Sequence, residues 1–254
     1  MKIVLIGAGN VATVLGKLFY KHGHQIIQVL GRRAETAQLL ADQLNCEAVL
    51  SIKNISKDAD LYIIAIPDDA VILIAEELRL TDKLVIHTAG TLRVDTIQKI
   101  SEHIGVIWPL QSLRKEIKEI PDIPFVIDGI SLDVTESLKK FLHTVTEKVI
   151  VLKDKERIKL HLSAVMVSNF TNHLYTLAQD YCKENDLPFN FLNPLITETA
   201  LRLNLYEAKE VQTGPSVRGD NKTVAAHLNL LEGREQIKSL YKEFDKSIRD
   251  SLNK

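Results

Sequence analysis

The first 152 residues alternate short, β-branched apolar runs with stretches that place apolar side chains at helical spacing. Strand-like runs rich in Val and Ile occur at residues 2–6, 25–30, 61–66 and 83–87. The intervening stretches with helical periodicity are residues 11–22, 34–44 and 69–78. This alternation predicts βαβ units built around a buried parallel sheet.

The same pattern continues to residue 152 and then changes. Further strands are expected at residues 105–109, 124–128 and 147–152, with a helix at 133–143. Beyond Lys153 the β-branched runs give way to long helical periodicities with few breakers. The sequence therefore predicts an α/β fold in which an N-terminal Rossmann doubly wound sheet, residues 1–153, precedes an all-helical C-terminal domain, residues 154–254.

One predicted helix of the second domain carries no charge. No Asp, Glu, Lys or Arg occurs from His161 to Gln179, and a helix without a charged face is normally covered on all sides. The stretch is too polar for a membrane span, so the rest of its domain, the Rossmann domain or a second subunit is expected to cover it. Because a domain of about 100 residues cannot easily do so alone, we predict a homodimer formed through residues 154–254.

Composition narrows the class of ligand. Hydrophobic residues make up 45% of the 254 and charged residues 26%, ordinary values for a folded soluble protein. Lys and Arg (32) nearly balance Asp and Glu (33), so we expect a small-molecule partner and neither nucleic acid nor a membrane. Cys46 and Cys182 lack the spacing of a metal site or a disulfide framework. The sequence has no His/Cys/Asp cluster with metal spacing, so no bound metal is expected. No small-residue cleavage site ends the first apolar run, so we expect a cytoplasmic protein.

A dinucleotide-binding motif follows the first predicted strand. Residues 7–12 have the form GxGxxA and open the first predicted helix. In such a turn the first glycine permits the bend, the second lets the pyrophosphate reach the backbone, and the small third residue allows close packing. The cofactor site is therefore expected to include Gly7, Gly9, Asn10, Val11 and Ala12, with the phosphates on free N–H groups of the helix.

The residues after the second strand bear on the choice of cofactor. An NAD site usually places an acidic residue there, about 20 positions beyond the glycines, to bind the ribose hydroxyls. This chain has Arg32 and Arg33 instead, and a guanidinium suits the 2′-phosphate of NADP(H). We therefore predict NADP(H) as the cofactor. The alternative is that one or both arginines are only solvated at the start of a helix.

Several segments together resemble a known family. They are GAGNVA at 7–12, IPDDAV at 66–71, HTAG at 87–90, WPLQSL at 108–113, KLHLSAVMVSNF at 159–170 and GPSVRGD at 214–220. With them the chain resembles, over nearly its whole length, the Rossmann-like plus domain-of-unknown-function-2520 family of predicted oxidoreductases. That family is similar to pyrroline-5-carboxylate reductase, prephenate dehydrogenase and 6-phosphogluconate dehydrogenase, which pair a Rossmann domain with a helical, often dimer-forming domain. The layout is also similar to an alternative class of ketopantoate reductase.

The chain departs from these relatives at two places. In enzymes like 6-phosphogluconate dehydrogenase a Lys is followed about one turn later by an Asn, whereas here Lys159 is followed by Ser163 and the Asn comes at position 169. The family usually shows His-Pro-Leu where this chain has Trp108-Pro109-Leu110. A tryptophan suits stacking or packing there, but it cannot act as an acid.

Candidate site residues follow from the strand ends, because ligands of open α/β sheets bind beyond the carboxyl ends of the strands. We expect the cofactor to contact Ile66, Pro67, Thr88 and Ala89 as well as the glycine turn. The strand-end residues expected to bind substrate are His87, Gln111 and Ser112. For His87 the alternative is a hydrogen bond that closes a strand end.

The uncharged helix and a later loop supply the remaining candidates. At 100° per residue His161, Ser168, Asn172 and Gln179 share one stripe, either as a cleft wall or as an internal network or dimer seam. His161 is the expected proton donor, with Lys159 as the runner-up by analogy, while Asn169 or Ser168 orients the substrate. Arg218 is the candidate clamp for a substrate carboxylate, its alternative being a salt bridge with Asp220 or a neighbouring helix.

These residues predict an NADP(H)-dependent oxidoreductase that reduces a small carbonyl or imine acid, with a ketopantoate-like compound as one candidate substrate. The rival hypothesis is a non-catalytic dinucleotide-binding or sensor protein with a dimerising helical domain. Mixing NADPH with a panel of oxoacids and cyclic imines distinguishes them, because only an enzyme consumes the cofactor.

Overall fold

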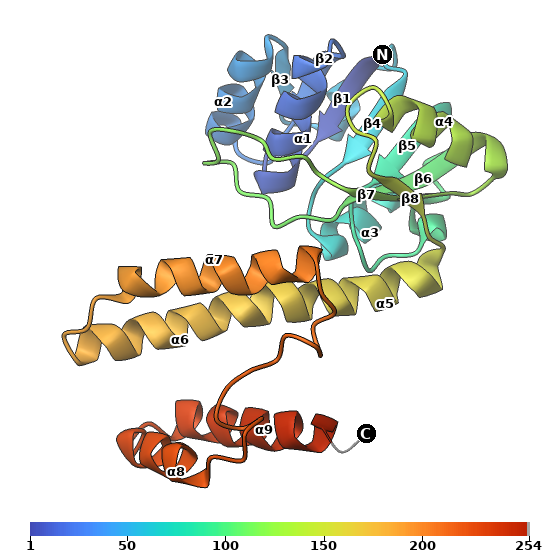
Figure 1. Ribbon diagram of the computed structural model, residues 1–254. Helices are drawn as coiled ribbons and strands as arrows, with labels where there is room; N and C mark the ends of the chain where they lie inside the picture. Colours follow the sequence, from blue (N-terminus) through green and yellow to red (C-terminus); the bar gives the residue numbers. More distant parts are fainter. Residues whose placement is uncertain (253–254) are drawn as a thin grey trace. The chain divides into compact units, whose positions relative to one another are not determined.

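The computed structural model describes residues 1–252 and divides into two compact units, the first from Met1 to Asn169 and the second from Phe170 onward (Figure 1). The division falls later in the chain than residue 153. The reason is that the helix α5 (Asp154–Ala164) packs on the sheet of the first unit, where Leu160 and Ala164 contact a cluster around Trp108.

The first unit is built on a sheet with the order β3-β2-β1-β4-β5-β6-β7-β8. Within residues 1–252 its strands are β1 (Lys2–Ile6), β2 (Gln25–Leu30), β3 (Glu47–Val49), β4 (Leu61–Ile64), β5 (Thr81–His87), β6 (Ser101–Pro109), β7 (Phe125–Gly129) and β8 (Val149–Val151). All neighbouring strands are parallel except β6 and β7. The predicted α/β class and doubly wound sheet are confirmed, while the short β3 and the reversed direction of β7 were not predicted.

Helices cover both faces of this sheet (Figure 1). The helices α1 (Asn10–Lys21), α2 (Ala34–Leu44) and α4 (Leu132–Leu142) close one face over a core that includes Phe19, Phe125 and Leu138. On the other face lie α3 (Asp68–Glu77), the 3-10 turn η2 (Val94–Ile97) and α5. A second 3-10 turn, η1, spans Ile52–Asn54. Apolar residues from both faces of each buried strand therefore enter a core, as the near-continuous Val and Ile runs predicted.

The helix that leaves the first unit is interrupted by a wider turn. After α5 the chain forms a π-helix from Val165 to Phe170 and then continues as α6 (Thr171–Glu184). A π-helix bonds residue i to i+5 and so turns later side chains away from a regular 100° stripe. The predicted alignment of His161 with Asn172 and Gln179 on one stripe therefore does not hold across this segment.

The second unit is helical within the described residues. Its elements after α6 are η4 (Phe189–Leu192), α7 (Asn193–Leu201), η5 (Arg202–Asn204), α8 (Asn221–Leu230) and α9 (Glu235–Leu252). As predicted, Asp220 caps α8, with Oδ1 accepting from the Thr223 N–H at 3.1 Å. The Thr223 hydroxyl donates to the same carboxylate and holds the pKa of Asp220 below its usual range.

Most side chains of the uncharged stretch His161–Gln179 are exposed within residues 1–252. Val167 is 74% exposed, and Phe170, Leu174 and Tyr175 are exposed as well. Burial within the same domain, one of the three expected explanations, is therefore wrong for most of this stretch. No helix in residues 1–252 is both long and apolar enough to cross a membrane.

Candidate active site

The glycine turn between β1 and α1 has the shape of a dinucleotide site. Gly7 lies at φ 129°, and a Cβ on it would come within 2.3 Å of the Ala65 carbonyl oxygen, so a larger residue does not fit. A Cβ on Gly9 would meet no atom within 4 Å, which leaves the outer side of the turn open. Gly9 is the N-cap of α1 and offers no side chain to the N–H groups of the first turn, among them those of Asn10 and Val11. This turn fits a pyrophosphate.

The arginines predicted to bind the 2′-phosphate lie close to this turn in the structure. The Gly7 N–H donates to the Leu30 carbonyl at 2.8 Å, which ties the turn to the end of β2. Arg32 and Arg33 follow two and three residues later, are exposed, and form no salt bridge with any residue in 1–252. Two cations without a protein counter-ion are therefore available to a ligand on this side of the turn.

The other predicted cofactor residues gather at the same edge of the sheet. Ile66 and Pro67 follow β4, which pairs with β1, and the Ala65 N–H donates to Ile6 at 2.8 Å. Thr88 and Ala89 follow β5, and the Thr88 N–H donates to the Ile64 carbonyl at 3.1 Å. The carboxyl ends of three neighbouring strands thus form one surface, as expected for a switch point of a doubly wound sheet.

His87 lies below this surface in the core of the unit. Its side chain is fully buried, its Nδ1 accepts from the Ala89 N–H at 3.3 Å, and its Nε2 donates to the Arg93 carbonyl at 3.1 Å. These contacts assign the neutral tautomer protonated on Nε2. Burial lowers the pKa of His87 to about 4. Since both ring nitrogens have backbone partners, the hydrogen bond that closes a strand end is the arrangement found for His87.

A pocket of about 330 Å³ lies within the first unit, between the end of β6 and the helix formed by α5 and the π-helix. His161 faces Trp108 across one wall, with ring centroids 5.4 Å apart and planes inclined by 42°. Gly90 packs against both of these rings, because a Cβ on it would lie 2.6 Å from Cδ2 of His161 and 2.9 Å from Cε2 of Trp108. The backbone after β5 therefore touches both rings.

The polar groups of the pocket include five of the predicted site residues. Gln111, Ser112, His161, Ser168 and Asn169 all line it. Ser168 and Asn169 sit in the π-helix, and such segments are frequent at functional sites. The Gln111 side-chain oxygen accepts from the Ser112 N–H at 3.2 Å. These residues surround the aromatic wall with hydroxyl, amide and imidazole groups, none of them a permanent charge.

Two further predicted site residues, Lys159 and Arg218, are not among the residues that line this pocket. Lys159 is exposed on α5 and is not part of the pocket lining, although its carbonyl accepts from the Ser163 hydroxyl at 3.3 Å. Arg218 is exposed in the second unit, in the loop before α8. Its charge contributes to the lowered pKa of Asp220, after the hydrogen bonds from Thr223.

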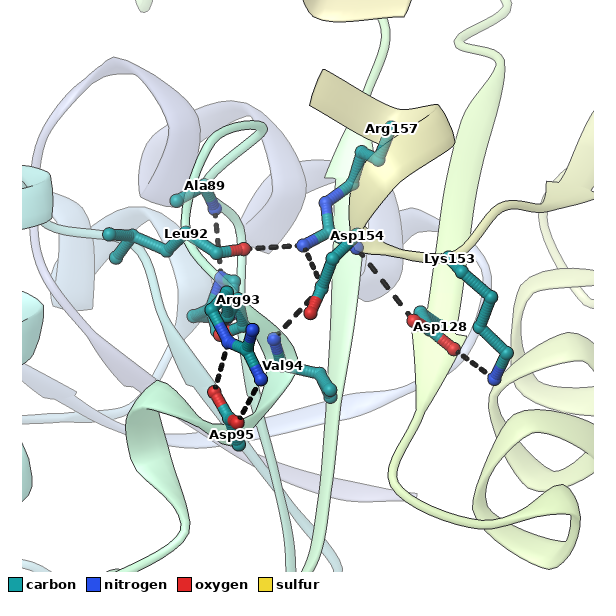
Figure 2. A network of polar contacts seen from close by, with 10 residues as sticks. Ala89, Leu92, Arg93, Val94, Asp95, Asp128, Lys153, Asp154 and Arg157 are labelled. Atoms are coloured by element: carbon teal, nitrogen blue, oxygen red, sulfur yellow. Dashed lines mark hydrogen bonds and ion pairs between the residues drawn. The ribbon is translucent and has the colours of Figure 1, made fainter. Parts of the chain in front are cut away.

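A buried charged cluster next to the pocket was not predicted from the sequence. Arg157, 1% exposed, and Asp128, 2% exposed, lie under the start of α5 with Asp154 and Lys153 (Figure 2). The sequence contains a signal for this cluster, because residues 154, 157, 161 and 164 share one helical face. That face places Asp154 and Arg157 on the same side of the helix as His161. No group of three or more His, Cys, Asp or Glu side chains in residues 1–252 is placed to hold a metal.

The first unit thus combines a Rossmann-type sheet and glycine turn with a pocket, at the end of β6, that contains several polar side chains. Residues 2–90 match the family model of the NADP oxidoreductases described as coenzyme F420-dependent, and residues 123–248 match a domain of unknown function, DUF2520. BF3122 from Bacteroides fragilis, provisionally described as an NADP oxidoreductase, is 35% identical, with 98% of both chains covered and a TM-score of 0.91. The chain belongs to the Rossmann-like oxidoreductase family that carries this domain, as its motifs predicted.

More distant solved structures share the fold. A 1-pyrroline-5-carboxylate reductase from Streptococcus pyogenes is 15% identical, covering 99% of this chain and 97% of that one, with a TM-score of 0.66. An imine reductase from Myxococcus stipitatus, in complex with NADP+, is 16% identical, covering 100% and 94%, with a TM-score of 0.64. The chain spans about half, 56%, of a curated relative, the glutamyl-tRNA reductase of Methanococcus maripaludis, to which it is 25% identical over 213 residues, 72% of this chain.

Proposed function

We propose that the protein is an NADP(H)-dependent reductase of a small carbonyl or imine acid. The observation that carries this proposal is the position of Gly90. It belongs to the loop that begins with Thr88 and Ala89 at the cofactor edge, and it packs against His161 and Trp108 in the pocket wall. A nicotinamide held at that edge would therefore share a wall with a pocket that has a titratable group.

The choice of NADP(H) rests on Arg32 and Arg33. Both guanidinium groups are exposed beside the glycine turn, where a phosphate dianion would accept charge-assisted hydrogen bonds. The imine reductase neighbour supports the choice because its structure contains NADP+. Coenzyme F420, named in the matching family model, is the competing redox cofactor and belongs in every binding experiment.

In the proposed mechanism, a reduced nicotinamide bound at the glycine turn would provide hydride chemistry at the carbonyl or imine carbon. His161, as the imidazolium, donates its proton to the oxygen or nitrogen that gains charge, and is left as neutral imidazole. Ser168 and Asn169, on the same pocket wall, orient the substrate by hydrogen bonds. Trp108 and Gly90 hold the imidazole in place by contact.

The proposed substrate class rests on the residues that line the pocket and on the reductases of similar structure. An aromatic wall with amide and hydroxyl groups suits a compact polar molecule, and a pocket of about 330 Å³ is at the small end of ligand sites. Two structural neighbours are reductases of a pyrroline carboxylate and of imines, which supports the choice of an imine acid. A ketopantoate-like oxoacid is the other candidate, and Arg218 remains our prediction for the residue that binds its carboxylate.

A panel assay tests the proposal. The purified protein is mixed with NADPH, NADH or reduced F420 and a series of cyclic imine acids and oxoacids, and the loss of cofactor absorbance is followed. Steady consumption of NADPH with at least one compound is expected. Tight NADPH binding without consumption across the panel would instead identify a dinucleotide sensor.

We also propose that the chain forms a homodimer through its helical part. Support comes from the exposed apolar side chains of the uncharged stretch and from an apolar pocket of about 480 Å³ lined by residues of α6, α8 and α9. Light scattering is expected to give the mass of a dimer. Leu174→Glu should give a monomer, whereas Lys183→Glu, a charge change on the same helix, should leave the dimer intact.

A further inference from the structure

Arg157 is buried in the first unit although much of its hydrogen-bonding capacity is unused. Its Nη2 donates to the Leu92 carbonyl and, at 2.6 Å, to Oδ1 of Asp154 (Figure 2). Its Nη1 is 4.0 Å from Oδ2 of Asp128, and neither Nη1 nor Nε has a hydrogen-bond partner in residues 1–252. Burying unpaired donors is costly, so stability alone gives little reason for an arginine at this position.

The partners of Arg157 show what it holds. Asp154 also accepts from the Val94 N–H at 3.1 Å, and His87 donates to the Arg93 carbonyl at 3.1 Å. Three consecutive residues of the loop after β5, Leu92 to Val94, are therefore bound through their backbone by buried or half-buried side chains. Figure 2 shows these bonds converging from α5 on one side and from the loop on the other.

The charges of the cluster balance. Lys153 donates to Oδ1 of Asp128 at 2.7 Å, so the cluster contains two cations and two carboxylates. A balanced cluster does not call for a further ion. Its effect is geometric, since a planar guanidinium joins a carbonyl of the loop to a carboxylate of the helix in one fixed orientation.

The loop held in this way reaches the pocket at its other end. Gly90 lies two residues before Leu92 and contacts His161, which follows Arg157 by four residues on the same face of α5. Thr88 and Ala89, at the cofactor edge, belong to the same short loop. The position of Arg157 therefore bears both on the expected nicotinamide contact and on the proposed proton donor.

We propose that Arg157 is a positioning residue that fixes the loop Thr88–Val94 against α5 and thereby sets the place of the nicotinamide relative to His161. The inference rests on the proposed function for the identity of the ligand, and on the hydrogen bonds alone for the fixing of the loop. A residue needed only for folding would affect all ligand binding alike, or none of it. A positioning residue acts on the nicotinamide half of the cofactor.

The test compares NADPH with adenosine 2′,5′-bisphosphate, which lacks the nicotinamide. The main variant combines Asp154→Asn with Arg157→Met, removing one cation and one anion together so that no unpaired carboxylate is left by the change. Arg157→Lys is the conservative variant, keeping the charge without the planar fork. Arg93→Ala is the matched control, because Arg93 lies in the same loop but its side chain is 71% exposed and pairs with Asp95.

We expect the double variant to lose at least tenfold in NADPH affinity while the Kd of the bisphosphate changes less than twofold. Arg157→Lys should fall between it and the wild type, and Arg93→Ala should match the wild type. Amide hydrogen exchange of residues 88–94 should speed up most in the double variant, less in Arg157→Lys, and not in Arg93→Ala. Equal losses for both ligands, or unchanged NADPH affinity with unchanged exchange, would overturn the proposal.

Failure of the proposed function gives a different result. If the wild type binds neither NADPH nor the bisphosphate, the cofactor assignment is wrong, and hydrogen exchange of residues 88–94 then decides the positioning claim by itself. If the double variant does not fold, the Kd values of NADPH and the bisphosphate are compared in Arg157→Lys instead. The expected loss of NADPH affinity is then smaller.

Discussion

The imidazole of His161 lies against the indole of Trp108, with ring centroids 5.4 Å apart. Trp108 is the single tryptophan of the chain. Its fluorescence therefore reports on this pocket and on no other part of the molecule. Of the two helix residues named as proton donors, Lys159 and His161, only the histidine lines the pocket.

Replacing His161 should slow catalysis without affecting cofactor binding. General acids contribute about 10²- to 10⁴-fold to rate, so His161→Ala should lower kcat by at least the smaller factor. Lys159→Ala, two residues away on α5 and exposed, is the matched comparison and should retain kcat. Steady-state kinetics with NADPH titrations decide between them. If Lys159→Ala loses activity and His161→Ala keeps it, the roles are reversed.

The exposed arginines should determine the preference for NADPH. Losing one charge-assisted hydrogen bond to the 2′-phosphate should weaken NADPH binding by about ten- to a hundredfold. Arg32→Ala and Arg33→Ala are therefore expected to raise the Kd for NADPH and to leave that for NADH nearly unchanged. Calorimetric titration with both cofactors measures this. Equal affinity of the wild type for NADH and NADPH would show that the arginines are only solvated.

Two glycine variants should distinguish the role of the glycine turn in cofactor binding from the role of the pocket in turnover. A Cβ on Gly9 meets nothing within 4 Å, so Gly9→Ala should fold normally but obstruct the pyrophosphate and weaken NADPH binding. A Cβ on Gly90 would lie 2.6 Å from His161, so Gly90→Ala should shift the Trp108 emission and lower turnover while adenosine 2′,5′-bisphosphate still binds. Identical behaviour of the two variants in both assays would contradict this separation.

Stability should depend on pH through His87. Burial lowers its pKa from 6.5 to about 4 in the folded protein, so as the pH falls the unfolded chain takes up the proton first. The buried neutral His87 therefore contributes fully to the free energy of unfolding above the pKa that it has in the unfolded chain. This contribution is lost as the pH falls towards 4. Between pH 7 and pH 5 this amounts to about 2 kcal/mol.

Urea unfolding followed by Trp108 fluorescence at both pH values measures this loss for the first unit. His87→Gln is expected to be less stable at pH 7 and to lose about 2 kcal/mol less than the wild type on going to pH 5. An equal loss in both proteins would show that His87 does not titrate in this range.

Much of the first unit could be predicted because its elements have strong local patterns. The helix Ala34–Leu44 has the predicted bounds, and the dinucleotide turn stands where its glycines placed it. β3 was missed because its three residues, Glu47–Val49, are too few to show a pattern. The reversed direction of β7 was missed because apolar periodicity is the same in both directions of a strand.

The pocket was harder to predict because it depends on contacts between distant segments. The π-helix Val165–Phe170 is read from sequence as an ordinary helix, since its residues also suit an α-helix. Arg157 resembles a solvated residue in a charged first turn, and only the long-range contact with the Leu92 carbonyl reveals its burial. Gly90 was predicted only as part of a strand-end motif, and its contact with Trp108 appears in three dimensions alone.

Deuterium-labelled NADPH tests directly whether the protein transfers a hydride from the nicotinamide to a substrate. The cofactor, labelled at the transferred position of the nicotinamide, is incubated with the protein and each imine acid or oxoacid of the panel, and the products are examined by mass spectrometry. We expect one deuterium on the reduced carbon of at least one product. His161→Ala should form this product at least about a hundredfold more slowly. Products without deuterium, or no product from any compound while NADPH stays bound, would contradict it.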